Sequence, residues 1–133
     1  MNYVLDSSAV ICFLRDEPGA DAFEQLLIDA ENKFILHAVN WVEIRYLEQR
    51  SQASSVNSLR QFIDQANVEV IGNFDFKYLD RVASLKAFRT PIALGDCFAV
   101  ALAQVLDAIL VTTDRGELEK IASTGECKIL FLR

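Results

Sequence analysis

The sequence is poor in histidine and in paired cysteine, two residue types on which many catalytic and metal sites depend. His37 is the single histidine among 133 residues, and it follows an apolar run at 34–36. This excludes sites built from several imidazoles, and we interpret His37 as a partly buried structural residue rather than a catalytic one. The three cysteines at positions 12, 97 and 127 lie far apart and form no CxxC pair, which predicts buried free thiols in a reducing compartment.

Long apolar runs and chain-breaking residues are also scarce. No apolar stretch reaches the roughly 20 residues that cross a bilayer, and the first residues lack the pattern of a signal sequence, so we expect a soluble, cytoplasmic protein with no membrane association. Two prolines and five glycines accompany 52% hydrophobic residues and nine phenylalanines, a composition typical of a packed globule. The length fits one domain spanning 1–133.

Basic charge is in deficit. Nineteen Asp and Glu residues against 13 Lys and Arg residues give a net charge of −6 and an isoelectric point near 4.7. The field of such a protein repels nucleic acid. Any polyanionic partner would therefore have to be held by a metal ion or by a local group of basic side chains.

Short apolar runs alternate along the chain with segments of helical periodicity. Runs rich in Val, Ile, Leu and Phe predict buried strands at 3–5, 34–36, 68–71, 108–112 and 128–132. Apolar residues at three- and four-residue steps predict helices at 9–14, 20–30, 40–49, 55–66, 75–88, 94–106 and 116–122. Strands that are apolar throughout and separated by helices indicate an α/β protein, a three-layer α/β/α fold with a central parallel sheet of about five strands.

Four carboxylates lie where this fold would bring them together. Asp6 follows the first predicted strand and Asp114 follows the fourth, so both belong at the carboxyl edge of the sheet. Glu43 lies one turn into the helix after the second strand. Asp96 begins a helix that runs antiparallel to the fourth strand, which starts this helix at the same edge. The sequence therefore predicts one edge carrying four acidic side chains.

Each of these residues also has a simpler interpretation. Asp6, Asp96 and Asp114 could cap helix N-termini, and Glu43 could lie on a solvated helix face. Capping does not explain why four distant segments deliver carboxylates to one edge. Clustered carboxylates raise one another's pKa unless a cation lies among them, and oxygen ligands alone favour Mg²⁺ or Mn²⁺ over zinc. The residues themselves thus point to phosphodiester or phosphoryl chemistry.

The order and spacing of these motifs resemble the PIN-domain ribonucleases, and in particular the VapC-type toxins of bacterial toxin–antitoxin pairs. The matching segments are LDSSAV at the start, EPGAD at 17–21, NWVEI around Glu43, LGDCFAVALA around Asp96 and LVTTDRGELEKI near the end. The resemblance implies a PIN-like fold and a metal-dependent endoribonuclease that hydrolyses RNA with Mg²⁺, or Mn²⁺ in its place. Its catalytic and metal-binding residues would be Asp6, Glu43, Asp96 and Asp114.

The resemblance also implies supporting residues and partners. Ser8 or Thr113 would supply a hydroxyl that orients the carboxylates or a metal-bound water, the alternative being a local cap or turn bond. Glu117 would be a further acid near the metal, the alternative being a solvent-facing side chain in the first turn of a helix. Expected partners are an RNA substrate cut to 5′-phosphate and 3′-hydroxyl ends, a small antitoxin protein and a second copy in a homodimer. Candidate phosphate contacts are Arg15, Arg45, Arg89 and Arg115.

Other Mg²⁺-using α/β classes fit the motifs less well. A phosphatase of the haloacid-dehalogenase type would need DxD after the first strand, and Ser8 occupies the second acidic position. A receiver domain would need an early acidic pair and a lysine near its last strand, whereas Asp6 has no acidic neighbour and Lys128 begins a predicted strand. Two alternatives within the family stay open: a catalytically silent PIN-like binding protein and a housekeeping RNA-processing nuclease.

Overall fold

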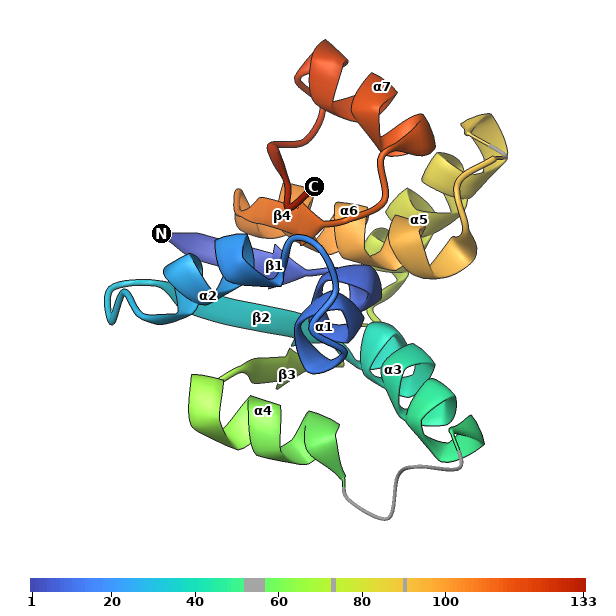
Figure 1. The fold of residues 1–133 in the computed structure, drawn as a ribbon. Coiled ribbons are helices and arrows are strands. Elements are labelled where there is room, and N and C mark those ends of the chain that lie inside the picture. The colour runs from blue at the N-terminus through green and yellow to red at the C-terminus, as the bar shows by residue number, and fades with distance from the viewer. Residues whose placement is uncertain (52–56, 73, 90) are drawn as a thin grey trace.

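The central feature of the computed structural model is a parallel sheet, seen within residues 1–51, 57–72, 74–89 and 91–133, which the structure describes. The strands are β1 (Asn2–Leu5), β2 (Lys33–His37), β3 (Glu69–Ile71), β4 (Ile109–Thr112) and β5 (Ile129–Phe131). Their order is β3-β2-β1-β4-β5, and every neighbouring pair is parallel. The predicted three-layer α/β/α fold is confirmed (Figure 1).

The helices agree with the predicted pattern, with shifts at their ends. They are α1 (Ser7–Leu14), α2 (Ala20–Leu27), α3 (Ala38–Arg50), α4 (Ser58–Ala66), α5 (Phe76–Phe88), α6 (Leu94–Leu106) and α7 (Gly116–Thr124). Helix α1 begins two residues before the predicted start because the Asp6 side chain caps it, accepting a hydrogen bond from the Ser7 backbone N–H. The predicted start of α4 at 55 and 56 lies outside the described residues.

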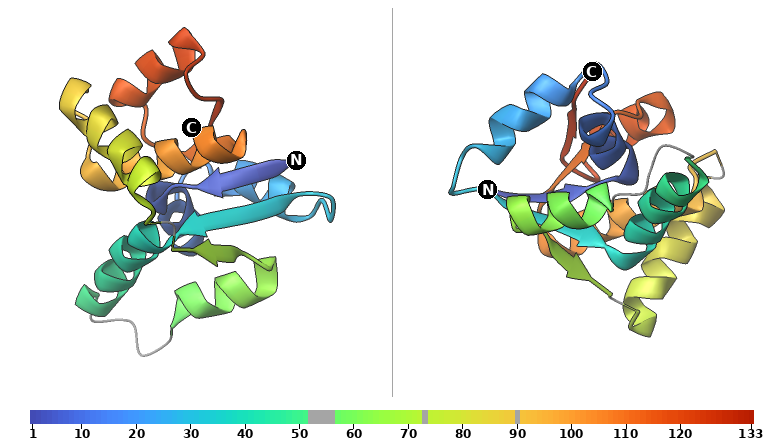
Figure 2. Two further views of the ribbon diagram at one scale, coloured as in Figure 1. Left: turned by 180° about the vertical axis from the view of Figure 1, so that it is seen from behind. Right: turned by 60° about the horizontal axis from the view of Figure 1, so that its bottom comes forward.

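One face of the sheet packs against α6 and its neighbours. Val4 of β1 and Leu110 of β4 are fully buried there, together with Val100 and Leu102 of α6 and Ile121 of α7. Helix α6 carries no charged residue after Asp96 until its C-cap, which suits its place between the sheet and α5. The rear view in Figure 2 shows α5 and α6 on this side of the sheet.

The opposite face of the sheet is covered by α1, α2 and α4. Leu5 of β1 and Val111 of β4 pack here against Val10, Phe23 and Leu59. Adjacent residues of one strand enter opposite cores because side chains alternate across a sheet. Strands that are apolar at every position therefore signal a sheet covered on both faces, as the sequence predicted.

The single histidine and the three cysteines are all buried in the structure. His37 is fully buried and ends β2, where its Nδ1 accepts a hydrogen bond from the Val39 backbone N–H at 3.0 Å and so caps α3. Its structural interpretation agrees with this position, although burial is complete rather than partial. The predicted free, buried thiols are confirmed for Cys12, Cys97 and Cys127.

Among the described helices, none combines the length and hydropathy needed to cross a membrane.

Phe23 of α2 tests the core between the sheet and α1, α2 and α4. Its ring is fully buried and lies within about 6 Å of three other aromatic rings, those of Phe13, Phe34 and Phe62. Phe23→Ala should lower the free energy of unfolding by about 3–5 kcal/mol, measured by urea denaturation. Phe88→Ala is the matched control, since that ring is 87% exposed, and it should change the free energy by less than about 0.5 kcal/mol. Equal losses in the two variants would contradict the assigned core.

Candidate active site

The pairing of β1 with β4 creates the floor of the site. Leu5 lies opposite Val111 in register, and the Asp6 backbone N–H donates to the Val111 carbonyl oxygen at 3.0 Å. This continues the ladder one residue past β1 and sets Asp6 beside Thr112, the last residue of β4. Because the strands are parallel, both residues lie at the carboxyl edge of the sheet.

Asp6 is almost completely buried and fully hydrogen-bonded. Its Oδ1 accepts from the Ser7 backbone N–H at 2.8 Å, and its Oδ2 accepts from the hydroxyls of Ser8 at 3.0 Å and Thr112 at 2.8 Å. Three donors aimed at one carboxylate offset part of the loss of hydration that burial imposes, while the pKa of Asp6 stays raised by that burial. Asp6 is thus an N-cap and a fixed carboxylate of the site at once.

Two hydroxyls connect Asp6 to the end of β4. Ser8 Oγ accepts from the Thr113 backbone N–H at 3.1 Å, and Thr112 Oγ1 accepts from the Asp114 backbone N–H at 3.0 Å. Ser8 therefore occupies the orienting position that the sequence suggested for Ser8 or Thr113. The threonine hydroxyl that reaches Asp6 belongs to Thr112, while Thr113 contributes its backbone.

Thr112 was passed over in the sequence, although a signal for it existed. It closes a buried strand and shares the face of Leu110, since side chains alternate along β4. A hydroxyl at that position is buried and needs a partner. The carboxylate of Asp6 on the neighbouring strand is that partner.

Glu43 is held where α3 meets the first turn of α6. The Asn40 side-chain Nδ2 donates to Glu43 Oε1 at 2.8 Å and to the Gly95 carbonyl oxygen at 3.0 Å. The Ser7 side chain also hydrogen-bonds to Glu43. Glu43 is half-buried, so the alternative of a solvated helix face does not describe its surroundings. Asn40 is a second residue of the site that the sequence did not single out.

The capping alternative holds for Asp6 and fails for the other two aspartates. Asp96 lies inside the first turn of α6, whose N-cap is Ala93. Asp114 precedes Arg115, which is the N-cap of α7. Neither side chain therefore occupies the N-cap position, although Asp96 lies in the first turn of α6, where the helix dipole favours an acidic residue.

Burial and mutual repulsion perturb the carboxylates. Burial raises the pKa of Asp6, and hydrogen bonds from Thr112, Ser8 and Asp96 act in the opposite direction. Burial, followed by the charges of Asp6 and Asp114, raises the pKa of Asp96 to about 8. Burial raises the pKa of Glu43, and the charge of Asp6 raises it further. The hydrogen bond from Asn40 lowers it by less than burial raises it. The pKa values of all three carboxyl groups are therefore raised, in each case first by burial.

A cavity of about 260 Å³ opens beside Asp96. Its lining includes Asp96, Asp114 and Glu117, together with residues that precede α6. Glu117 is also paired with Lys120, at 2.8 Å between Oε1 and Nζ. Three of the predicted acidic residues thus line one cavity. The charges of Asp6 and Glu43 act on one of the three, Asp96, and raise its pKa.

The donor set suits a hard divalent cation that keeps much of its water. Within the described ranges, no three His, Cys, Asp or Glu side chains are gathered into a ready-made metal cage. Mg²⁺ does not require one, because it dehydrates reluctantly and is commonly bound through one or two carboxylates. A cation would also offset the carboxylate charges that, after burial, raise the pKa of Asp96. The residues therefore fit a partly hydrated divalent cation held by one or two carboxylates, and not one in a closed cage.

Two of the four candidate phosphate-binding arginines are engaged elsewhere. Arg89 is paired with Glu126. Arg115 is paired with Glu119 at 2.6 Å and donates from Nε to the Arg133 carbonyl oxygen at 2.8 Å. Neither guanidinium is directed at the carboxylates in this arrangement, because other parts of the fold hold both of them.

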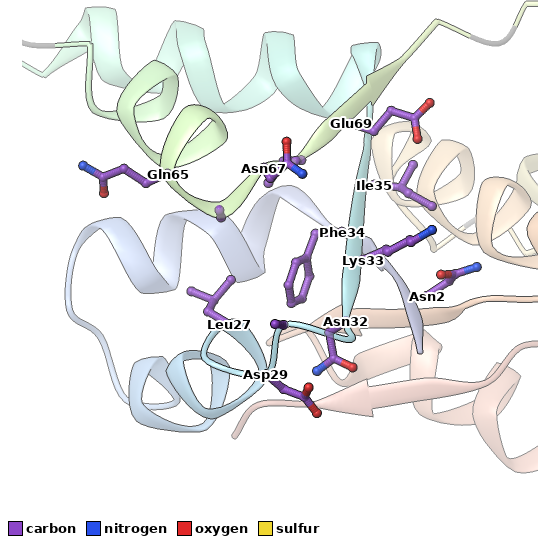
Figure 3. A pocket seen from close by; sticks show the side chains of 13 residues that line it. Asn2, Leu27, Asp29, Asn32, Lys33, Phe34, Ile35, Gln65, Asn67 and Glu69 are labelled. Atoms are coloured by element: carbon purple, nitrogen blue, oxygen red, sulfur yellow. The ribbon is translucent and has the colours of Figure 1, made fainter.

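A larger cavity lies at the opposite edge of the sheet. It has a volume of about 810 Å³ and is lined by residues at the amino ends of three strands, including Asn2, Lys33 and Glu69 (Figure 3). None of the predicted site residues lines it. Size alone therefore does not mark the site, whereas the chemistry of the carboxylates does.

The fold and this edge define a class: an α/β protein that gathers carboxylates at the carboxyl end of a parallel sheet. Residues 3–123 match the PIN domain, and the chain belongs to that family. PIN domains are generally nucleases. The comparison with curated proteins finds no match.

Solved structures show the same fold. The VapBC structure from Salmonella typhimurium bound to DNA has a TM-score of 0.78 at 19% identity, covering 100% of this chain and 99% of that one. VapBC2 from Rickettsia felis, bound to a DNA fragment from their promoter, has a TM-score of 0.75 at 19% identity over 98% of each chain. VapBC-1 from nontypeable Haemophilus influenzae has a TM-score of 0.71 at 20% identity, covering 99% and 98%.

The raised pKa of Asp96 predicts a pH-dependent effect on stability. The carboxyl titrates near 8 in the folded protein and near its ordinary value of 3.8 in the unfolded chain. Between these values the unfolded chain loses the proton first, so this group makes the protein less stable as pH rises from 4 to 8. Asp96→Asn removes this effect. Without metal, its Tm should match that of the unsubstituted protein near pH 4 and exceed it by several degrees at pH 9.

Asp107→Asn is the control for this comparison. Asp107 is exposed, lies at the other end of α6 and has a left-handed backbone (φ 49°), which asparagine tolerates. In the same thermal scans, the difference in Tm between Asp107→Asn and the unsubstituted protein should not grow between pH 4 and pH 9. If the difference in Tm for Asp96→Asn also stays constant between pH 4 and pH 9, the raised pKa of Asp96 is contradicted.

Proposed function

We propose that this protein is a Mg²⁺-dependent endoribonuclease and the toxin of a type II toxin–antitoxin pair. The observation that carries the proposal is the meeting of Asp6, Glu43, Asp96 and Asp114 at one sheet edge in a chain of the PIN family. Burial and then the charges of the neighbouring carboxylates raise the pKa of Asp96, a perturbation that supports a site for a cation. The similarity in fold to VapBC structures supports the toxin assignment.

Each carboxylate has a separate task in this proposal. Asp6, Asp96 and Asp114 would hold the cation, directly or through water, and Mn²⁺ could replace Mg²⁺. When bound, the metal polarises the phosphate and lowers the pKa of a coordinated water. Glu43 would complete the site and accept a proton from the attacking water.

The hydrogen bonds around these carboxylates suit those tasks. Ser8 and Thr112 fix the Asp6 oxygens, so Asp6 supplies an oriented negative charge without rotating. Asn40 keeps Glu43 near Asp96 and favours its ionised form, the form that can accept a proton. Preorganised groups of this kind need little rearrangement when charge develops on the phosphate.

The acidic surface makes the cation central to substrate binding. With a net charge of −6, the protein repels RNA over most of its surface. Arg89 and Arg115 are held by Glu126 and Glu119, so they contribute less to capture of the phosphate backbone than free arginines would. Affinity for RNA should therefore depend strongly on the metal.

Cleavage of a panel of structured RNAs with Mg²⁺ tests the nuclease. Asp6→Asn and Asp96→Asn should each lower the cleavage rate by at least about 100-fold, because each removes a charge that holds the cation. EDTA should abolish cleavage, and end analysis should find 5′-phosphate and 3′-hydroxyl products. Asp107→Asn, a remote and exposed carboxylate, is the matched control and should cleave normally.

Two outcomes would contradict this mechanism. Persistent cleavage by both purified and folded aspartate variants would show that the carboxylates are not needed. Failure of the unsubstituted protein on every RNA would favour the alternative of a catalytically silent PIN-like binding protein. Circular dichroism of each variant confirms that only folded proteins are compared.

A growth assay separates a toxin from a housekeeping nuclease. Expression of the protein alone should arrest bacterial growth, and co-expression with the small protein encoded beside it should restore growth. Asp96→Asn should not arrest growth, whereas Asp107→Asn should. The two proteins should co-purify, and light scattering of the nuclease alone should give the mass of a homodimer. Normal growth during expression of the active protein would favour the housekeeping role.

A further inference from the structure

Asn40 joins two elements that are distant in sequence. It is fully buried on α3, three residues before Glu43. Its Nδ2 donates to Glu43 Oε1 at 2.8 Å and to the Gly95 carbonyl oxygen at 3.0 Å. One amide nitrogen thus ties a carboxylate of α3 to the first turn of α6, 55 positions further along the chain.

The direction of the Asn40 amide follows from these partners. Both acceptors are oxygens, so a reversed amide would set the Asn40 oxygen against them. In the observed direction both amide hydrogens are used, while the buried Oδ1 makes no hydrogen bond to any part of the chain that is described. A buried acceptor without a protein partner is unfavourable. Stability alone is therefore a poor reason for asparagine here, and its contact with Glu43 is a better one.

Gly95 completes the contact from the other side. A Cβ on residue 95 would lie 2.4 Å from both carboxylate oxygens of Glu43, which is far inside any non-bonded distance. Gly95 lies within α6 and is not among the glycines with positive φ. The need for glycine at this position therefore comes from the close approach of Glu43 and not from the backbone. Asp96 is the next residue, and the charge of Glu43 acts on its carboxyl group, so the two carboxylates are near each other at this edge.

We infer that Asn40 and Gly95 form a seat that fixes the Glu43 carboxylate beside Asp96, and that this seat sets how tightly the acidic edge binds a divalent cation. Asn40 is a positioning residue, since it acts through Glu43 and not on the substrate. Removing hydrogen bonds that orient a metal-binding side chain typically weakens metal binding by about 10- to 100-fold. The inference rests on the proposed function only in requiring a metal at this edge.

A thermodynamic cycle on the full chain tests the seat. Calorimetric titration with Mg²⁺, repeated with Mn²⁺, gives the Kd for Asn40→Ala and Gly95→Ala, each made in the unsubstituted protein and in Glu43→Gln. Each should weaken binding about tenfold in the first background and less than about twofold in the second, because the side chain that the seat positions is already altered there.

The two variants protect the test against a folding defect. Asn40→Ala removes the donor, whereas Gly95→Ala leaves Asn40 intact and displaces only the flexible end of Glu43. Alanine also favours a helix more than glycine does, so Gly95→Ala should fold. Matched controls are Asn32→Ala and Gly72→Ala. The Asn32 amide donates to the Leu26 carbonyl oxygen in the opposite cavity, and a Cβ at Gly72 would meet only ordinary contacts.

The outcomes separate this inference from the proposed function. An unchanged Kd in both variants, or the same loss with and without Glu43→Gln, overturns the seat. If the unsubstituted protein binds Mg²⁺ but cleaves no RNA, the nuclease proposal fails and the affinity cycle still decides about the seat. If it binds no divalent cation, both are overturned. If the unsubstituted protein cleaves RNA but Asn40→Ala and Gly95→Ala bind Mg²⁺ with an unchanged Kd, the nuclease proposal stands and the seat is overturned.

Discussion

The site depends on one buried carboxylate held across two parallel strands. Asp6 extends the β1 ladder by a backbone hydrogen bond to Val111, and its side chain takes donors from Ser7, Ser8 and Thr112. These bonds link strand β4 and helix α1 to a single charged group. These donors offset part of the cost of burying a carboxyl group. Asp6 in turn raises the pKa values of Asp96 and Glu43.

The clustered carboxylates that the proposed function needs lower the stability of the fold at the same sheet edge. Burial, with the nearby charges of Asp6 and Asp114, raises the pKa of Asp96 to about 8. Glu43 is held near this edge by its contacts with Asn40 and Gly95. Without a cation, like charges in a partly buried setting weaken the fold. A cation held at this edge would offset the repulsion. The carboxylate contacts therefore agree with the proposal of a divalent-cation site.

Agreement between sequence and structure is closest where local pattern and burial act together. All five predicted strands exist, with every end within one residue of its prediction. The continuous apolar runs suit the three central strands, which are covered on both faces, whereas the edge strands β3 and β5 are less buried. Agreement is poorer where a side chain's partner is distant in sequence. The helical position of Asn40 does not reveal its bond to Gly95. Strand alternation places Thr112 on a buried face, but only the packed structure shows that its partner is Asp6.

By itself, the sequence determined the fold class, the acidic character and the identity of the four carboxylates at the sheet edge, because strand and helix periodicity place residues after a parallel strand at its carboxyl end. Only the tertiary structure decided which groups orient them. The bonds from Thr112 to Asp6 and from Asn40 to Glu43, and the contact of Glu43 with Gly95, join or fix side chains whose meeting requires packed elements. Such contacts depend on ångström-scale distances across the fold, and the order of residues along a chain does not contain those distances.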